Sequence, residues 1–219
     1  MESDPTHATT EQPAEDAPKR RGLKRLLLGL LVGLVVVVVA VAVAFRVQIR
    51  RPFPDVDGTV ALPGLSSEVE VIRDSMGVPH IYADTVADLF MAQGYVHAQD
   101  RFFQMDFWRH ISEGRLAEMF GSSQLETDRF LRTMGWGRIA QIEYDNDSPE
   151  NRAVLDAYAA GVNAYLNERS PVELGFEYTV LEALNHSYDP EPWSPHQTLA
   201  WGKVMAWDLG GNMANEITR

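Results

Sequence analysis

The chain contains no cysteine among its 219 residues. This absence excludes disulfide bonds, thiol nucleophiles and thiolate metal sites. The sequence also lacks a G-x-S-x-G elbow, an H-E-x-x-H pair and a glycine-rich phosphate loop, so it shows no self-contained hydrolase, metalloprotease or nucleotide-binding motif. A domain of this size without disulfides must be held together by packing, by a partner chain or by bound metal.

Basic residues are also scarce. The chain has 19 lysines and arginines against 31 aspartates and glutamates, which gives a formal net charge of −12. The whole of this charge belongs to residues 46–219, because the acidic residues at the amino terminus are balanced by the basic cluster that follows them. A body this acidic repels a phosphate backbone, so we expect no nucleic-acid partner.

The longest apolar run, residues 26–45, contains no charged residue. A helix of this length crosses the roughly 30 Å of a bilayer core, so the run predicts a transmembrane helix or an export signal. Basic residues flank it on both sides, and the larger cluster precedes it, which favours a cytoplasmic amino terminus. The flanking residues are Lys19, Arg20, Arg21, Lys24 and Arg25 before the run, and Arg46, Arg50 and Arg51 after it.

An Ala-x-Ala pattern at residues 42–44 would suit signal peptidase, but the apolar run is longer than the about 7 to 15 residues of a cleaved signal. We therefore predict a signal anchor, with the rest of the protein periplasmic or extracellular. A cleaved export signal is the alternative. Residues 1–25 are then a cytoplasmic tail with a basic flank, and the polar, acidic composition of the tail predicts disorder.

Residues 46–67 mix basic residues, proline and glycine and predict a linker, so we expect the ordered domain to span residues 68–219. The domain opens with strand signals. Residues 68–71 alternate polar and apolar side chains, residues 74–77 have turn chemistry, and residues 80–83 resume an extended pattern. This arrangement predicts a β-hairpin.

Three helices are predicted from capping residues and apolar periodicity. Asp84 or Thr85 can cap the first, which runs to about Glu113. A serine followed by proline opens each of the other two, at residues 148–169 and 194–209. The first and third helices are apolar around most of their circumference, which predicts burial inside something large.

Four charged residues interrupt the apolar first helix. Unpaired buried charge costs several kcal/mol, so they predict a mutually satisfied network that fixes packing, with direct catalysis as the alternative. Two of them are three residues apart, which supports pairing. The six histidines are scattered along the chain and predict structural roles. The four charged residues are Asp100, Arg101, Asp106 and Arg109.

Several motifs follow one another in order through residues 68–219. Residues 94–105 read Gly-Tyr-Val-His-Ala-Gln-Asp-Arg-Phe-Phe-Gln-Met, and residues 114–118 read Gly-Arg-Leu-Ala-Glu. In this ordered combination the chain resembles the amino-terminal part of the penicillin acylase (penicillin amidase) family. The other matching segments are residues 73–83, 158–164, 193–195 and 205–207.

The resemblance implies an amino-terminal-nucleophile hydrolase whose precursor cuts itself into an α chain, a spacer and a β chain. This chain resembles only the α part. The implied nucleophile is a serine exposed as the first residue of the β chain, beyond Arg219, so no catalytic residue is expected here. The implied fold class is α+β, a four-layer αββα sandwich. To it this mostly helical chain, preceded by one transmembrane helix, contributes the α-chain part of an αβ heterodimer.

The resemblance also implies two contributions to sites. Counted from Trp193, Ala206, Leu209 and Gly210 fall where the family's α chain lines the acyl pocket with larger side chains. Small residues leave volume for a long aliphatic acyl chain; packing of this helix in the core is the alternative. Glu216 falls where the α chain supplies one oxygen ligand to a structural calcium ion, with a surface or helix-end glutamate as the alternative. No organic cofactor is expected.

The expected reaction is hydrolysis of a linear amide between an acyl group and an amine such as a β-lactam nucleus. Two rivals remain open. A wide acyl pocket favours an N-acyl homoserine lactone acylase of the same family. A chain whose translation ends at Arg219 would instead be a noncatalytic, membrane-anchored remnant or interaction module, poorly soluble because its apolar helices lack a β chain.

Overall fold

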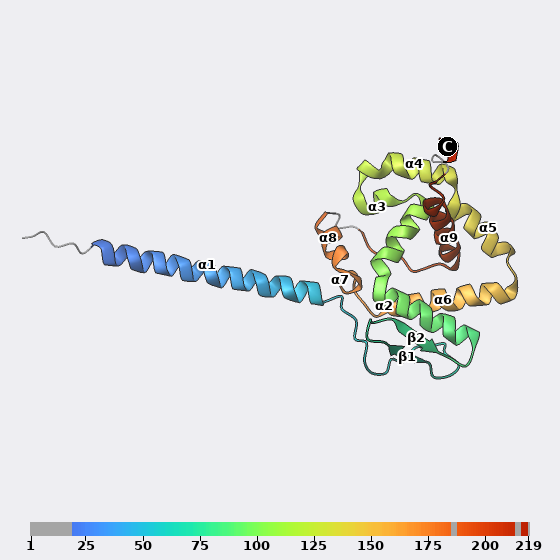
Figure 1. Cartoon of the computed structure of the whole chain (residues 1–219), viewed down its shortest axis with the longest axis horizontal. Coiled ribbons are helices and arrows are strands. Elements are labelled where there is room, and N and C mark those ends of the chain that lie inside the picture. The colour runs from blue at the N-terminus through green and yellow to red at the C-terminus, as the bar shows by residue number, and fades with distance from the viewer. Residues whose placement is uncertain (1–18, 185–187, 213–215, 219) are drawn as a thin grey trace, which may run out of the picture. The chain divides into compact units, whose positions relative to one another are not determined.

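A computed structural model describes residues 19–184, 188–212 and 216–218. The chain divides into two compact units, Met1–Val47 and Gln48–Arg219. The second unit is mostly helical, with one two-stranded sheet among its described residues. Figure 1 shows the helices and strands of both units along the chain.

Most of helix α1, Lys19–Arg50, belongs to the first unit. One stretch of it, Gly22–Arg50, is long and apolar enough to cross a membrane by its length and composition. A helix covers the predicted apolar run, residues 26–45, and continues beyond it through residues 19–25 and 46–50. The rest of the predicted tail lies outside the described residues.

The predicted hairpin is confirmed. Strand β1, Glu70–Arg73, pairs antiparallel with strand β2, Pro79–Tyr82. The Asp74 carboxylate accepts hydrogen bonds from two backbone N–H groups of the connecting turn, at 2.8 and 2.9 Å. Gly77 has a φ of 80°, in the left-handed region that favours glycine. The local turn chemistry therefore fixes the hairpin.

Helix α2, Val86–Glu113, begins where the sequence predicts. The Thr85 hydroxyl caps it by accepting from the backbone N–H of Asp88 at 3.1 Å, and Gly114 ends it with a φ of 63°. One feature was not predicted. Arg101 has non-helical dihedral angles, φ −150° and ψ 32°, so α2 is kinked at this residue. No proline or glycine lies at the kink to indicate it in the sequence.

Helix α6, Pro149–Asn167, crosses α2 at very close range (Figure 1). A Cβ atom added at Gly94 of α2 would lie 2.1 Å from the backbone oxygen of Tyr158. A Cβ added at Gly161 of α6 would lie 1.9 Å from the backbone oxygen of Met91. The two glycines therefore let the helix backbones touch, and no other residue fits at either position without backbone movement.

Helix α9, Pro195–Leu209, confirms the third predicted helix and packs against α2, α5 and α6. The shorter elements, which lie between the predicted ones, were not predicted from the sequence. These are α3 Leu116–Phe120, the 3-10 helix η1 Ser122–Gln124, α4 Leu125–Met134, α5 Trp136–Asn146, α7 Pro171–Leu174 and α8 Phe176–Leu184.

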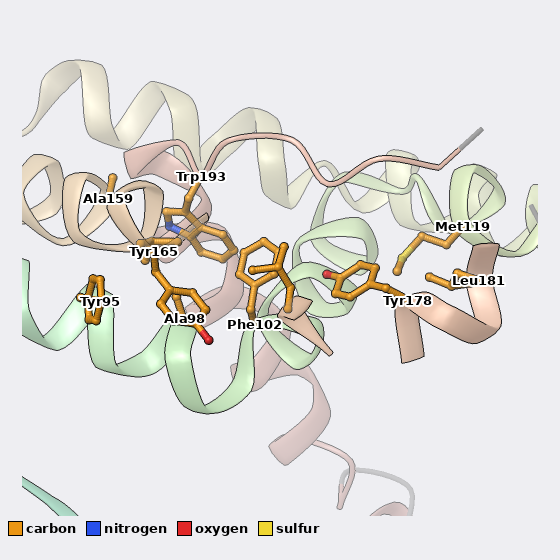
Figure 2. Close-up of a cluster of buried hydrophobic side chains, with 11 residues drawn as sticks. Tyr95, Ala98, Phe102, Met119, Ala159, Tyr165, Tyr178, Leu181 and Trp193 are labelled. Atoms are coloured by element: carbon orange, nitrogen blue, oxygen red, sulfur yellow. The ribbon is translucent and has the colours of Figure 1, made fainter. Parts of the chain in front are cut away.

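A cluster of buried apolar side chains joins α2, α6 and α8 (Figure 2). Phe102 of α2 stacks on Tyr178 of α8 with ring centroids 6.2 Å apart. Tyr95 of α2 meets Tyr165 of α6 edge to face, with centroids 5.3 Å apart. Burying a large apolar side chain contributes about 1.5–3 kcal/mol, so this cluster is a main source of stability. Its other members are Ala98, Met119, Ala159, Val162, Leu174, Leu181 and Trp193.

Candidate functional site

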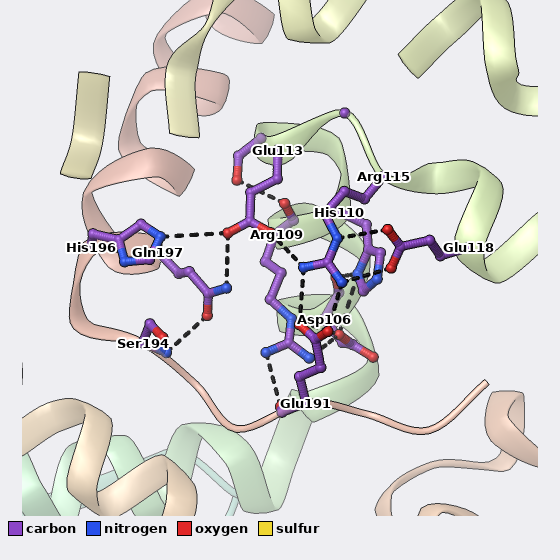
Figure 3. Close-up of polar contacts among 12 residues, drawn as sticks. Asp106, Arg109, His110, Glu113, Arg115, Glu118, Glu191, Ser194, His196 and Gln197 are labelled. Atoms are coloured by element: carbon purple, nitrogen blue, oxygen red, sulfur yellow. Dashed lines mark hydrogen bonds and ion pairs between the residues drawn. The ribbon is translucent and has the colours of Figure 1, made fainter. Parts of the chain in front are cut away.

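A fully buried ion pair lies in the second half of α2 (Figure 3). Arg109 donates from Nε to Asp106 Oδ1 at 2.8 Å, and its Nη2 lies 2.6 Å from the same oxygen. Asp106 Oδ2 accepts hydrogen bonds from the hydroxyls of Tyr178, at 2.7 Å, and Tyr188. The predicted pairing of these two charges is confirmed. The buried carboxylate receives these four contacts from three residues, so it links α2 to the segments that carry the two tyrosines.

The same arginine holds the segment that leads into α9. We call residues 188–194 the strap. Arg109 Nη1 donates to the backbone oxygens of Glu191 and Pro192, at 2.9 and 3.2 Å. Asn163 of α6 exchanges two hydrogen bonds with the backbone of Trp193, at 2.7 and 2.9 Å. The strap is therefore tied to α2 and α6 by side-chain contacts to its backbone.

Glu113, at the end of α2, connects α2 to the first turn of α9 (Figure 3). Its Oε1 accepts from Gln197 Nε2 at 2.9 Å and lies 3.6 Å from His196 Nε2. Its Oε2 accepts from Arg115 at 2.9 Å. Arg115 also forms a bidentate pair with the Glu191 side chain, at 2.8 and 2.9 Å. One carboxylate and one guanidinium thus hold both the strap and the helix that follows it.

The electrostatics of this network keep its carboxylates ionised. Burial alone would raise the pKa of Asp106, but hydrogen bonding to His110 and the charge of Arg109 lower it to about 2. Burial would likewise raise the pKa of Glu113, but the nearby His196 and hydrogen bonds from Gln197 and Arg115 lower it to about 2. The carboxylates of Asp106 and Glu113 are therefore charged at neutral pH.

We predict acid destabilisation of this network. The folded pKa values of Asp106 and Glu113 lie below their unfolded values, so their contribution is fully present above about pH 5 and is lost as the pH falls towards 2. The free energy of unfolding, measured in denaturant from pH 6 to pH 2, should fall over that range. In Glu113→Gln the fall should be smaller by on the order of 2 kcal/mol. An equal fall in wild type and variant would contradict the assignment.

Two of the four charges predicted to form the buried network lie elsewhere. Asp100 is exposed on α2 and pairs with Arg73 of the hairpin, with two hydrogen bonds of 2.7 and 3.0 Å. Arg101, at the kink of α2, is exposed. The prediction for these two residues was wrong because they lie on a part of the α2 surface that meets solvent and the hairpin and not the core. Asp100 instead fastens the hairpin to α2.

The three residues predicted to line an acyl pocket lie together at the carboxyl end of α9. Ala206, Leu209 and Gly210 are all exposed, and their i, i+3, i+4 spacing places them on one face. They do not belong to the core of the described chain. Beside them the Trp207 ring lies 5.8 Å from the ring of Trp136. The face is apolar and open, so it can form one wall of a pocket and needs a second wall.

Glu216, the predicted calcium ligand, is exposed and lies near the carboxyl end. Its Oε1 accepts from the Asn212 amide at 3.1 Å. Among the described residues, no group of three or more acidic, histidine or cysteine side chains is arranged to hold a metal ion. Calcium takes six to eight oxygen ligands, so Glu216 could supply only one of them.

A hollow of about 880 Å³ lies between residues 55–71, the hairpin and the first half of α2. None of the three predicted pocket residues lines it. The hollow is therefore separate from the open face of α9.

Comparison with known proteins decides the family. The model of the penicillin amidase family matches residues 68–219. The chain belongs to the penicillin amidase family. The resemblance inferred from the motifs is thereby confirmed.

Two similar proteins have names that state different substrates. The chain is 39% identical over 155 residues to penicillin acylase 2 proenzyme of Pseudomonas sp. (strain SE83), covering 71% of this chain and 19% of that protein. It is 36% identical over 167 residues to the acyl-homoserine lactone acylase QuiP of Pseudomonas aeruginosa, covering 75% of this chain and 19% of that protein. The chain therefore spans about a fifth of the length of these relatives.

A solved penicillin amidase structure is also similar. The thermostable penicillin G acylase of Alcaligenes faecalis matches with a TM-score of 0.55 and 34% sequence identity. The match covers 64% of this chain and 72% of that chain. The helical arrangement of the second unit is thus a family arrangement.

Sequence reasoning missed most of the network around the strap. Tyr178, Tyr188 and Glu191 lie 72 to 82 residues from the α2 residues they contact. Nothing in their local sequence indicates those partners. The one available signal was the pair Asp106 and Arg109 on an apolar helix, which requires further buried polar partners.

Proposed function

We propose that this chain is the α-chain part of an amidohydrolase that cleaves the linear amide between an acyl group and an amine. The observation that carries the proposal is the family match over residues 68–219, supported by a relative described as a penicillin acylase proenzyme. In the proposed enzyme a β chain from the same precursor completes a four-layer αββα sandwich. That β chain covers the open apolar face of α9.

The proposed nucleophile is a serine that becomes the first residue of the β chain, beyond Arg219. A free α-amino group has a pKa of about 8, so it can accept the hydroxyl proton near neutral pH. The serine oxygen attacks the amide carbon, and donors from the β chain stabilise the oxyanion. The amine leaves with the proton, and water then hydrolyses the acyl-enzyme and regenerates the serine.

This chain would contribute binding rather than chemistry. Ala206, Leu209 and Gly210 would form one wall of the acyl pocket, with their small or flexible side chains leaving space for the acyl group. Glu216 would supply one ligand of a structural calcium ion, and the β chain the others. Helix α1 would anchor the enzyme in the membrane, with residues 68–219 on the extracytoplasmic side.

A second candidate is hydrolysis of N-acyl homoserine lactones. It is favoured by a relative described as an acyl-homoserine lactone acylase and by the small side chains at Ala206 and Gly210. A pocket lined by small residues has more space, which suits a long aliphatic acyl chain better than a compact aromatic one. The two candidates share the same amide chemistry and differ in the amine that leaves.

The test is hydrolysis by the complete protein that contains this chain. Penicillin G and N-dodecanoyl homoserine lactone are the two substrates, and product amine is measured. We expect hydrolysis of at least one, and Ala206→Phe should lower kcat/KM for the dodecanoyl substrate by about tenfold. A folded protein that cleaves neither substrate would contradict the proposal and favour a noncatalytic remnant or interaction module. Preference for the lactone would select the second candidate.

A further inference from the structure

The strap and the first turn of α9 are held by directional contacts to buried or half-buried groups. Arg109, which is fully buried, donates to two strap carbonyls. Gln197 is 4% exposed and donates to Glu113 while its Oε1 accepts from the backbone N–H of Ser194, at 2.9 Å. Hydrogen bonds of this kind fix position, because moving either partner leaves a buried polar group unpaired.

The rest of α9 has weaker positional restraints. Its buried side chains beyond the first turn are Ala200 and Val204, whose apolar packing is non-directional. Near its carboxyl end the Trp207 ring packs on the ring of Trp136, with centroids 5.8 Å apart, and this contact is apolar too. The ion pair of Lys203 with Glu143, at 2.5 Å, involves an exposed glutamate, and such surface pairs contribute little. The buried, directional contacts of α9 that this chain supplies therefore lie at its amino-terminal end.

A displacement of that end would be carried along the helix. An α-helix is stiff over 15 residues and rises about 1.5 Å per residue, so Ala206, Leu209 and Gly210 move with the first turn. These are the residues to which we assign the wall of the acyl pocket. A shift of about 1 Å in such a wall is enough to change a rate substantially.

We propose that the contacts of the strap set the width of the acyl pocket by fixing the axial position of α9. Arg109, Glu113, Arg115 and Gln197 are then positioning residues for acyl-chain selection, although none of them touches the acyl group. The inference rests on the proposed function, because it assigns a role within the same pocket. It predicts that loosening the strap changes acyl-chain selectivity and not merely stability.

The experiment compares Glu191→Gln/Gln197→Leu with wild type in the complete protein. The double variant removes the ion pair to Arg115 and the hydrogen bond to Glu113 while nearly preserving side-chain volume. The matched control is Glu126→Gln, which removes an exposed ion pair to Arg129 on α4. The readouts are the ratio of kcat/KM for dodecanoyl and butanoyl p-nitroanilides, and amide hydrogen exchange of residues 195–201.

We expect the selectivity ratio of the double variant to change by about fivefold and its exchange over residues 195–201 to be about tenfold faster. The control should stay within about twofold of wild type in both. Where the double variant does not fold, Glu191→Gln alone, at a half-exposed side chain, should change the ratio by about twofold.

The inference would be overturned if the strap variants kept the wild-type ratio of kcat/KM for the two anilides, or the wild-type rate of amide hydrogen exchange over residues 195–201. A wild type that cleaves neither anilide defeats the proposed function instead. In that case the amide hydrogen exchange of residues 195–201 tests the positioning of α9 by the strap. Faster exchange in the variant supports this positioning, and unchanged exchange overturns it.

Discussion

Replacing Gly161 with alanine should destabilise the helical body by about 3 kcal/mol, at the upper end of the cost of overpacking a core. The added Cβ would lie 1.9 Å from the backbone oxygen of Met91, and a backbone atom cannot rotate away as a side chain can. Gly94→Ala, with a contact of 2.1 Å to the Tyr158 oxygen, should have a similar effect. The measurement is the free energy of unfolding in denaturant.

Gly202 provides the matched control, since it is also a helical glycine. A Cβ there would meet no atom within 4 Å. Alanine is favoured over glycine in a helix by up to about 1 kcal/mol, so Gly202→Ala should be neutral or stabilising. The opposite signs separate close helix contact from helix propensity. If all three variants changed stability alike, the close crossing of α2 and α6 would be wrong.

Removing the charge of Arg109 should cost about 3–5 kcal/mol, because Arg109→Met leaves the buried Asp106 carboxylate without its cation. The variant also leaves two strap carbonyl oxygens without their hydrogen-bond donor. Asp106→Asn/Arg109→Met removes both charges and should recover part of the loss. A double-mutant cycle in denaturant measures the coupling between the two residues.

An exposed ion pair gives the comparison. Arg129→Met breaks the pair with Glu126 on α4, where both side chains are exposed, and should change stability by less than about 1 kcal/mol. Equal costs for Arg109→Met and Arg129→Met would mean that burial does not set the strength of the α2 pair. Additive costs in the Asp106 and Arg109 cycle would mean that the two groups do not interact.

Local sequence signals were enough to predict several elements of the fold. The hairpin follows from turn chemistry around Asp74 and Gly77, and α2 from the capping Thr85. Helices α6 and α9 each begin with a serine followed by proline. These signals act within a few residues, so one sequence is sufficient to read them.

The remaining elements depend on tertiary contacts. Helices α3, α4 and α5 are short or amphipathic, and the start of α3 is held by Asp128 of α4, which accepts from two backbone N–H groups at 2.7 and 2.8 Å. The partner of Asp100 is Arg73, 27 residues earlier in the chain. The kink at Arg101 also has no proline or glycine to reveal it. Such pairings are set by how elements pack and not by local sequence.

The candidate site was predictable only in part, for a similar reason. Family resemblance pointed to Ala206, Leu209 and Gly210, and the spacing along a helix predicts their common face. The strap that precedes α9 is held by hydrogen bonds from residues of α2 and α6, and the ring of Tyr178 of α8 stacks on its Tyr188. No local sequence pattern links those residues. The contacts that position α9 could therefore be identified only from the structure.

The most direct test of the proposed function is the amino-terminal sequence of the largest fragment of the purified complete protein. We predict two polypeptides, of which the smaller contains residues 68–219 and the larger begins with serine. Changing that serine to alanine should leave a single uncut precursor that hydrolyses no amide. A wild-type protein that remains one polypeptide, or a larger fragment that begins with another residue, would contradict the account.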